Sequence, residues 1–400
     1  MIRSKITTYL FAACSAGIVF LMVRYPVAAV SASYQGLQLW WEKVFPALFP
    51  FFVMSELMIG FGVVTFAGVL MEPLMRPVFK VPGIGGFVFV MGLFSGFPAG
   101  ARMTARLYQE NKLSKYEAER LSSFTNFSNP LFLFNVIAVQ FFHQAALGIV
   151  IALAHYLGNI GVGLVMRFYN RGKKDEAKTT YSAVVFTKAL RSMHEERVNH
   201  FKPFGKMLGD AVVSSVQTLL AIGGFIALFS MAYHLLAQIG VIKILSLGLA
   251  FLIKMCGFSS DLGPASIPGI FELTIGAHEI GAAPVPLIER IIFVSGLLGF
   301  CGFSIQAQAI GILSQAGLSA RPFLLGRIFH AFFSGCAAWI LYHLFHISDH
   351  LNADPAFLAS ESAIRNVSDK TMQAGPMITA LVLFTFAWIL IRRILAKHGS

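Results

Sequence analysis

The sequence is dominated by long apolar stretches, each about the length that a helix needs to cross a lipid bilayer. Such a helix takes about 20 mainly apolar residues, and the candidates are residues 6–23, 45–70, 121–140, 145–166, 212–236, 241–258, 323–345 and 376–391. Lipid offers no partner to backbone N–H and C=O groups, so a chain of this kind crosses the bilayer as helices. We therefore predict an all-α, polytopic membrane protein with about 8–10 transmembrane helices.

Composition and charge distribution agree with a membrane protein and exclude a soluble one. Only 12% of the residues are charged and 56% are hydrophobic, whereas a soluble domain carries about 25% charged residues. The net charge of +12 does not indicate nucleic acid, because the basic residues cluster between apolar stretches, as in cytoplasmic loops. The cysteines show no paired spacing, so we expect no disulfide framework and no metal site. We also expect no cofactor. They are Cys14, Cys256, Cys301 and Cys336.

The basic residues also orient the chain. Segment 167–206 holds ten Lys/Arg and four Asp/Glu, a surplus of six that is half of the net charge, so it is predicted to be a cytoplasmic loop. Arg3 and Lys5 place the N-terminus on the same side. The first apolar stretch is expected to remain as a span, because Arg24 and Pro26 follow it where a signal peptide has small residues.

Two further apolar stretches, 84–101 and 263–302, are interrupted by glycine and proline. Broken helices at membrane depth are tolerated where protein or a water-filled cavity covers the freed backbone groups. These stretches are therefore predicted to lie along a solute path.

A weak internal repeat includes parts of both broken stretches. Val-Met-Gly-Leu at 90–93 precedes Leu113-Ser114, as Val-Ser-Gly-Leu at 294–297 precedes Leu318-Ser319. In the predicted topology the two halves run in opposite senses, which indicates an inverted repeat of the kind found in many secondary transporters.

The first candidate site is the Gly-Phe-Pro-Ala-Gly break at 96–100 and the helix expected after it. The unpaired N–H groups and the dipole of a helix N-terminus attract anions, and two arginines four residues apart add charge on one face. The alternative is an interfacial turn with ordinary cytoplasmic-side arginines. The candidate residues are Gly96, Phe97, Pro98, Gly100, Arg102 and Arg106.

The second candidate site is a polar cluster at 122–129, with six hydroxyl or amide side chains in eight residues. Such groups at the edge of a span are costly unless they bond one another or a solute. The alternative is a polar loop that caps a helix at Asn129–Pro130. The candidate residues are Thr125, Asn126, Ser128 and Asn129.

The third candidate is an acid inside the second broken stretch, Glu272, with Thr274 close by. An intramembrane carboxylate indicates a site for a proton, a cation or a polar substrate group; the alternative is a position at the membrane interface. Gln306 and Gln308 are candidate hydrogen-bond partners in the mirrored region.

Lone histidines in the spans, His155, His234 and His330, are expected to pack helices rather than to bind a ligand. Catalytic motifs are missing: neither His194-Glu195 nor His278-Glu279 is followed by the second histidine of HExxH, and no Walker loop or GxSxG elbow occurs. We therefore expect no enzyme and no ATP-driven transport by this chain.

Several segments together resemble the YlbJ-type sporulation integral membrane proteins. The resemblance extends over about residues 40–345 and rests on segments 72–83, 96–101, 119–132, 154–157, 208–211, 222–230 and 272–276. It implies a Gate domain for nucleoside recognition, related to concentrative nucleoside transporters. Where the family often has Asn-Asn-Ser-Gly-Pro or Asn-Thr-Ser-Gly-Pro, this chain has Asn-Phe-Ser-Asn-Pro at 126–130, with Asn129 in place of glycine.

The resemblance also implies a role and a division of the chain. The role is movement of dipicolinic acid, a planar aromatic dianion, across the outer forespore membrane. In this role, Arg102 and Arg106 are suited to bind one carboxylate through charge-assisted hydrogen bonds. Phe97, Phe124 or Phe127 is suited to stack on the aromatic ring. We divide the chain into a first span (1–30), a first Gate-like repeat (40–166), a basic loop (167–206), a second repeat (207–346) and a tail with one span (347–400).

Three functions compete at this point. The first is a carrier in the cell membrane or outer forespore membrane for dipicolinate or a similar anionic solute, with a coupling proton or cation. The second is a nucleoside or nucleobase carrier, which gives no reason for paired arginines at a broken helix. The third is a membrane scaffold of a sporulation complex that uses loop 167–206 for docking. A homo-oligomer is compatible with each of them.

Overall fold

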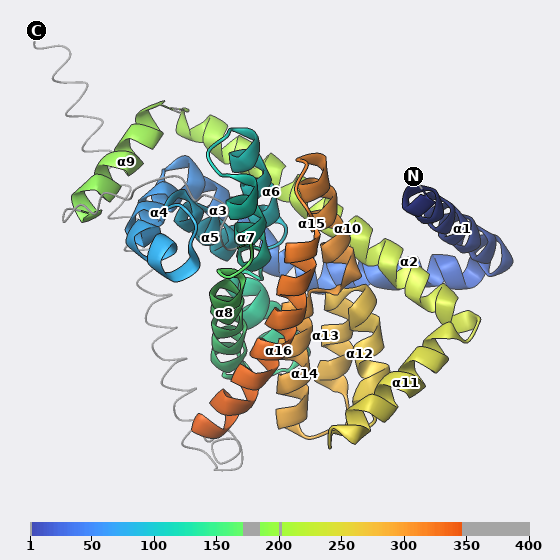
Figure 1. Ribbon diagram of the computed structural model, residues 1–400. Helices are drawn as coiled ribbons and strands as arrows, with labels where there is room; N and C mark the ends of the chain where they lie inside the picture. The colour runs from blue at the N-terminus through green and yellow to red at the C-terminus, as the bar shows by residue number, and fades with distance from the viewer. Residues whose placement is uncertain (1, 171–184, 200–201, 346–400) are drawn as a thin grey trace, which may run out of the picture. The chain divides into compact units, whose positions relative to one another are not determined.

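The computed structural model describes residues 2–170, 185–199 and 202–345, and the regular structure of these residues is helical, with no strand among them (Figure 1). The chain divides into two units, Met1–Leu341 and Tyr342–Ser400. By length and composition, the described residues hold four membrane-spanning helices, or up to six if bent pairs count as one span. The predicted all-α polytopic membrane fold is confirmed. The predicted span 376–391 lies outside the described residues.

The first part of the chain forms a scaffold of helices before the first broken stretch. The first helix agrees with the predicted apolar stretch 6–23, whereas the helical segments 26–44 and 75–79 lie outside the predicted stretches. The stretch 45–70 is divided because Gly62 adopts a left-handed conformation (φ 77°) between two helices. The elements are α1 (Ile2–Arg24), α2 (Pro26–Leu39), the π-helix η1 (Trp40–Val44), α3 (Phe45–Gly60), α4 (Val63–Leu74) and the π-helix η2 (Met75–Phe79).

The middle of the chain contains two interrupted helices. Stretch 84–101 is broken as predicted, but 121–140 was predicted as one span and is also broken, with residues 126–129 outside any helix. Pro130 accounts for this, because the residue before a proline is disfavoured in the helical conformation. The elements are α5 (Ile84–Ser95), α6 (Ala99–Gln109), α7 (Lys115–Thr125), the π-helix η3 (Phe132–Phe141) and α8 (Leu147–Met166).

The last described part repeats this arrangement of broken helices. Stretch 263–302 is divided at Glu272, at the prolines 284 and 286, and at Cys301. The elements are α9 (Val185–Asn199), α10 (Phe204–Gln238), α11 (Val241–Met255), α12 (Leu262–Phe271), α13 (Leu273–Ala282), α14 (Leu287–Phe300), α15 (Gly302–Gln315) and α16 (Arg321–Leu344).

The two short sequence repeats occupy equivalent places. In the first, α5 and α6 are followed by Ser114, whose hydroxyl accepts from the Glu117 N–H and caps α7. In the second, α14 and α15 are followed by Ser319, whose hydroxyl accepts from the Arg321 N–H at the start of α16. The two halves thus share the order helix, break, helix, serine turn, helix.

Packing follows from where the apolar residues lie. A core of buried side chains from η2 to α8, with residues of α15 and α16, includes Met75, Leu121, Phe124 and Phe323. Helix α10 packs along α2 and α3, and α4 packs between α5 and α9. Large apolar side chains such as Leu228 remain exposed; in a membrane protein these faces lie against lipid, where exposure of apolar surface carries no penalty.

Candidate functional site

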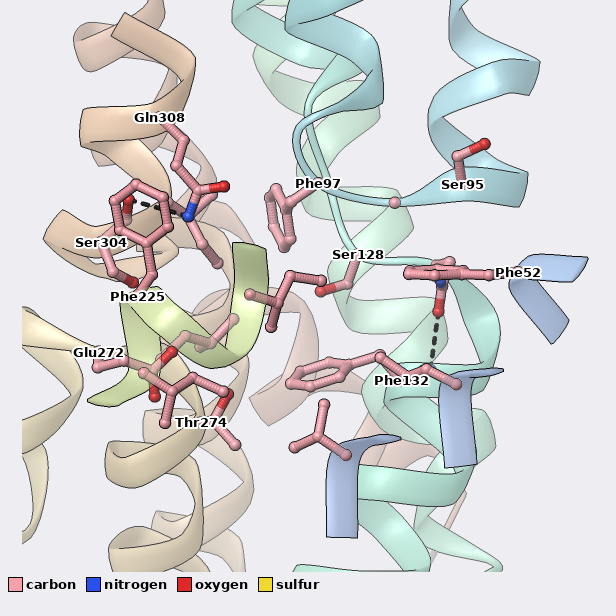
Figure 2. Close-up of a pocket in the computed structure, with 18 residues that line it drawn as sticks. Phe52, Ser95, Phe97, Ser128, Phe132, Phe225, Glu272, Thr274, Ser304 and Gln308 are labelled. Atoms are coloured by element: carbon pink, nitrogen blue, oxygen red, sulfur yellow. Dashed lines mark hydrogen bonds between the residues drawn. The ribbon is translucent and has the colours of Figure 1, made fainter. Parts of the chain in front are cut away.

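Four chain breaks meet around one small cavity. The α5–α6 break contributes Gly96 and Phe97, and the α7–η3 break contributes Ser128 and Asn129. From the other half, the α12–α13 break and the first turns of α15 contribute Glu272, Thr274, Ser304 and Gln308. We call this the central cavity. Figure 2 shows its two walls, with Glu272, Thr274, Ser304 and Gln308 facing Phe97, Ser128 and Phe132.

Apolar residues from two scaffold segments close the central cavity. They are Ile222, Phe225 and Ile226 of α10, with Val44, Leu48 and Phe52 of η1 and α3. The space open to the centres of water-sized molecules is about 60 Å³, and one buried water needs roughly 10–15 Å³ on this measure. The cavity therefore has room for a few waters, and an aromatic solute enters only if the two walls separate.

Glycine makes the first break. Gly96 has φ 68° and ψ −156°, a conformation open only to glycine, and Pro98 has no N–H to continue the helix. A Cβ at Gly96 would lie 3.2 Å from the backbone N of Asn129, and one at Gly100 would collide with the carbonyl oxygen of Thr125. The two breaks of the first half therefore pack directly against each other.

The second break is held by side chains from α8 and α16. The last carbonyls of a helix have no partner within it, and here Arg327 donates to Ser123 O (2.5 Å) and Asn126 O (2.7 Å). Asn159 of α8 donates to Phe124 O at 2.5 Å. These bonds satisfy the end of α7, where Ser123, Phe124 and Asn126 are buried from water.

The residues beyond this break are also fixed. The Ser128 N–H donates to Nε2 of His155 (3.1 Å), and the Asn129 side-chain oxygen accepts from the Phe132 N–H (2.8 Å) and caps the following helix. The capping function that sequence analysis left as the alternative for Asn129 thus coexists with its place in the cavity wall.

The third and fourth breaks form the opposite wall. Oε2 of Glu272 accepts from the Ile275 N–H (2.9 Å) and caps α13. Cys301 and Gly302 both have left-handed conformations, with φ of 63° and 68°, and a Cβ at Gly302 would lie 2.9 Å from Gly269 O. These two breaks are therefore also in direct contact.

The glutamines of α15 satisfy groups near the fourth break. Gln306 Nε2 donates to Phe300 O at 2.9 Å. Phe300 is the last residue of α14, so its carbonyl has no partner within that helix. Gln308 Nε2 donates to Ser304 O (3.3 Å) at the cavity wall (Figure 2). Gln306 is buried and does not line the cavity, whereas Gln308 does.

The two arginines lie in a neighbouring cavity, which we call the Arg102 cavity. Its volume on the same measure is about 190 Å³, and it shares Phe52, Ser95 and Phe97 with the central cavity. Pro98, Arg102 and Arg106 line it beside Glu56, Ser215 and Thr218. Arg106 is paired with Glu110 (2.8 Å), whereas the guanidinium of Arg102 has no ion pair with any described residue.

The remaining predicted residues lie behind the cavity wall. Gly100, Thr125 and Asn126 are buried in the packing between α6, α7 and α16, and the Thr125 hydroxyl donates to Leu121 O (2.8 Å). Neither side-chain amide atom of Asn126 has a partner among the described residues. Phe124 and Phe127, considered for ring stacking, are fully buried.

Sequence reasoning missed several residues that the structure places at the site. Ser304 and the phenylalanines Phe132 and Phe225 line the central cavity, and nothing in their local sequence distinguishes them. Arg327 had a usable signal, since an arginine within an apolar stretch is a functional candidate by default. Among the described residues, no group of His, Cys, Asp or Glu is arranged to hold a metal ion.

Comparison with known proteins gives the family. Residues 41–145 match the Gate family model, described as nucleoside recognition. The chain is 44% identical over 390 residues, 96% of each protein, to the sporulation integral membrane protein YlbJ of Bacillus subtilis (strain 168). An uncharacterized protein of Alkalihalophilus pseudofirmus is 28% identical over 134 residues, 32% of this chain and 28% of its own. No solved structure matches. The chain is therefore an integral membrane protein of the YlbJ sporulation family.

Proposed function

We propose that this protein carries a small planar anion through the membrane and that dipicolinate is its substrate. The convergence of four chain breaks on one cavity carries the proposal. Breaking a helix inside a bilayer frees backbone groups at considerable cost, and the chain does so four times around the same space. Secondary transporters bind solutes at such discontinuous helices.

The groups around the cavity suit a dicarboxylate. Helix α15 begins at the cavity without a side-chain cap from any described residue, so its first N–H groups are available to an anionic oxygen. In α6, by contrast, the Ala99 N–H already donates to Gly96 O (2.9 Å), and Gly100 and Ala101 are buried. The hydroxyls of Ser128 and Ser304 add donors, and the ring of Phe97 stands between the central cavity and the Arg102 cavity. A planar aromatic solute fits between such rings by stacking.

In this proposal, Glu272 couples transport of the solute to transport of a proton. It is 3% exposed and shares the central cavity with the proposed solute site. Two like charges in a space of low polarity repel strongly, so a dianion enters more readily when the Glu272 carboxyl is protonated. We expect solute and proton to move in the same direction, with Glu272 as the residue that links them.

A nucleoside is the second candidate substrate, and one observation favours it. Among the described residues that line the central cavity, Glu272 is the only charged one. A carboxylate with hydroxyl and amide neighbours suits the hydroxyls of a sugar, and the family model matched by residues 41–145 is named for nucleoside recognition. In this case Arg102 has no part in binding.

Ligand-dependent thermal unfolding of the purified protein in detergent tests the proposal. A ligand at 100 times its dissociation constant stabilises the folded state by about 2.7 kcal/mol. We expect dipicolinate to raise Tm and uridine to have no effect. Gln308→Ala should reduce the shift, whereas Gln315→Ala, an exposed glutamine at the end of the same helix, should preserve it. A shift with uridine alone would establish the nucleoside; no shift with either would contradict the proposal.

A further inference from the structure

Helix α10 passes three cavities in succession. The residues that line the Arg102 cavity, the central cavity and a third cavity recur every three or four positions, which places them on one face of the helix. They are Ser215 and Thr218, then Ile222, Phe225 and Ile226, then Ser230, Tyr233 and His234. From Ser215 to His234 the helix rises about 28 Å, close to the hydrocarbon thickness of a bilayer, about 30 Å.

The third cavity, which we call the His278 cavity, is polar. Its volume is about 350 Å³, and its wall includes Gln35 of α2, Tyr233 and His234 of α10, and His278 and Glu279 of α13. Nδ1 of His278 lies 3.5 Å from Oε1 of Glu279, and the two side chains are 45% and 51% exposed. A half-exposed carboxylate is expensive against lipid, so we expect the exposed side of Glu279 to face water.

Residues of α13 and two phenylalanines lie between neighbouring cavities. The first turn of α13 forms one partition: Glu272 and Thr274 face the central cavity, while Ile275 and His278 face the His278 cavity. The Ile275 N–H donates a hydrogen bond to the Glu272 carboxylate. A single peptide group therefore connects the residues that line the central cavity with those that line the His278 cavity. Phe97, with Phe52, forms the other partition, since both residues line the central and the Arg102 cavities.

We infer that the three cavities form one solute route along α10. The Arg102 cavity opens this route to water on one side of the membrane, and the His278 cavity opens it on the other side. The inference rests on the proposed transport and extends it to a site on the other side of the membrane. The ligand there is the same class of small carboxylate, for which Gln35 and Tyr233 offer N–H and O–H donors and the protonated His278 ring offers its Nε2–H. Glu279 is the local counter-charge of His278. The α13 partition and the Phe97–Phe52 partition act as the two gates.

Cysteine accessibility in sealed membranes tests this route without requiring transport. The exposed cysteines Cys14, Cys256 and Cys336 are replaced by alanine, and buried Cys301 is retained. Gln35→Cys and Thr218→Cys are then treated with a membrane-impermeant, charged thiol reagent in right-side-out and inside-out vesicles. Leu228→Cys is the control, because Leu228 is on α10 but outside the cavity face, apolar and 51% exposed.

The route predicts labelling of Gln35→Cys and Thr218→Cys from opposite sides, with Leu228→Cys unlabelled from either. Saturating dipicolinate should slow both reactions. If both cysteines react from the same side, or Gln35→Cys reacts from neither, the route is wrong. Opposite-side labelling in a protein that moves no solute would support the aqueous route and overturn the proposed transport.

Discussion

The guanidinium of Arg327 donates to the carbonyl oxygen of Asn126 at 2.7 Å, so a helix of the second half holds open a chain break of the first. Nη1 also donates to Nδ1 of His330 (3.1 Å), and Nε2 of His330 donates to the carbonyl oxygen of His155 (2.8 Å). His155 in turn accepts from the Ser128 N–H. The position of Ser128 in the cavity wall therefore depends on α8 and α16, and both histidines act in helix packing as predicted.

Loss of Arg327 should destabilise the protein. Arg327→Met leaves two buried carbonyls without donors, each at a cost of about 1–3 kcal/mol. Arg327→Lys should be intermediate, because a single ammonium lacks the planar fork that reaches both oxygens. Thermal unfolding in detergent measures the effect. Arg321→Met, at the exposed start of the same helix, is the control; equal stability of the two Met variants would contradict the capping role of Arg327.

Gly100→Ala should impair folding although alanine is the better helix former. Its Cβ collides with the carbonyl oxygen of Thr125, and overpacking of this kind costs about 1–3 kcal/mol. At Gly224, on α10, no atom lies within 4 Å of an added Cβ, so Gly224→Ala should be neutral or stabilise by up to about 1 kcal/mol. The yield of folded protein and Tm report both changes. A neutral Gly100→Ala would show that α6 and α7 do not pack this closely.

The basic loop should be cytoplasmic. Arg191 of α9 is in this loop, and its side chain is 83% exposed. In a background without the exposed cysteines, Arg191→Cys should react with an impermeant thiol reagent only after cells are permeabilised. Efficient reaction in intact cells would overturn the orientation of the first half of the chain.

Arg102→Lys should weaken anion transport. The substitution keeps the charge and loses the bidentate fork, which costs about 1.5–3 kcal/mol in binding, or roughly tenfold or more in affinity. Arg102→Gln should be worse. Arg106→Lys should have less effect, because Arg106 is already paired with Glu110. Transport of the uncharged diamide should not change in any variant. Wild-type affinity for dipicolinate in both Arg102 variants would remove Arg102 from the anion site.

Local sequence predicted the fold class, and three of the four chain breaks around the central cavity lie in the two stretches predicted to be broken. The apolar stretches are long enough to require helices. The break at 96–98 was predictable because Gly96 and Pro98 each change the backbone at their own position. The division of 45–70 was missed because Gly62 is one glycine in an otherwise apolar run, and only its conformation shows that the helix ends there. Pro130 was noted, but the extended segment before it was not anticipated.

The assembly of the site was not readable from local sequence. Seven of the predicted residues line the central cavity, namely Gly96, Phe97, Ser128, Asn129, Glu272, Thr274 and Gln308. Others of the same chemistry, such as Asn126 and Gln306, are buried and do not line the cavity. What separates the two groups is contact between segments far apart in the chain, and Arg327 bonding to Asn126 is an example.

Solute flux in proteoliposomes tests the central claim most directly. Purified protein in liposomes is supplied with radiolabelled dipicolinate or uridine, with and without an imposed proton gradient, beside the Glu272→Gln variant. We predict saturable dipicolinate uptake that a proton gradient accelerates, little uridine uptake, and loss of the acceleration in Glu272→Gln. Uridine uptake without dipicolinate uptake, or no flux of either solute through correctly folded protein, would contradict the account.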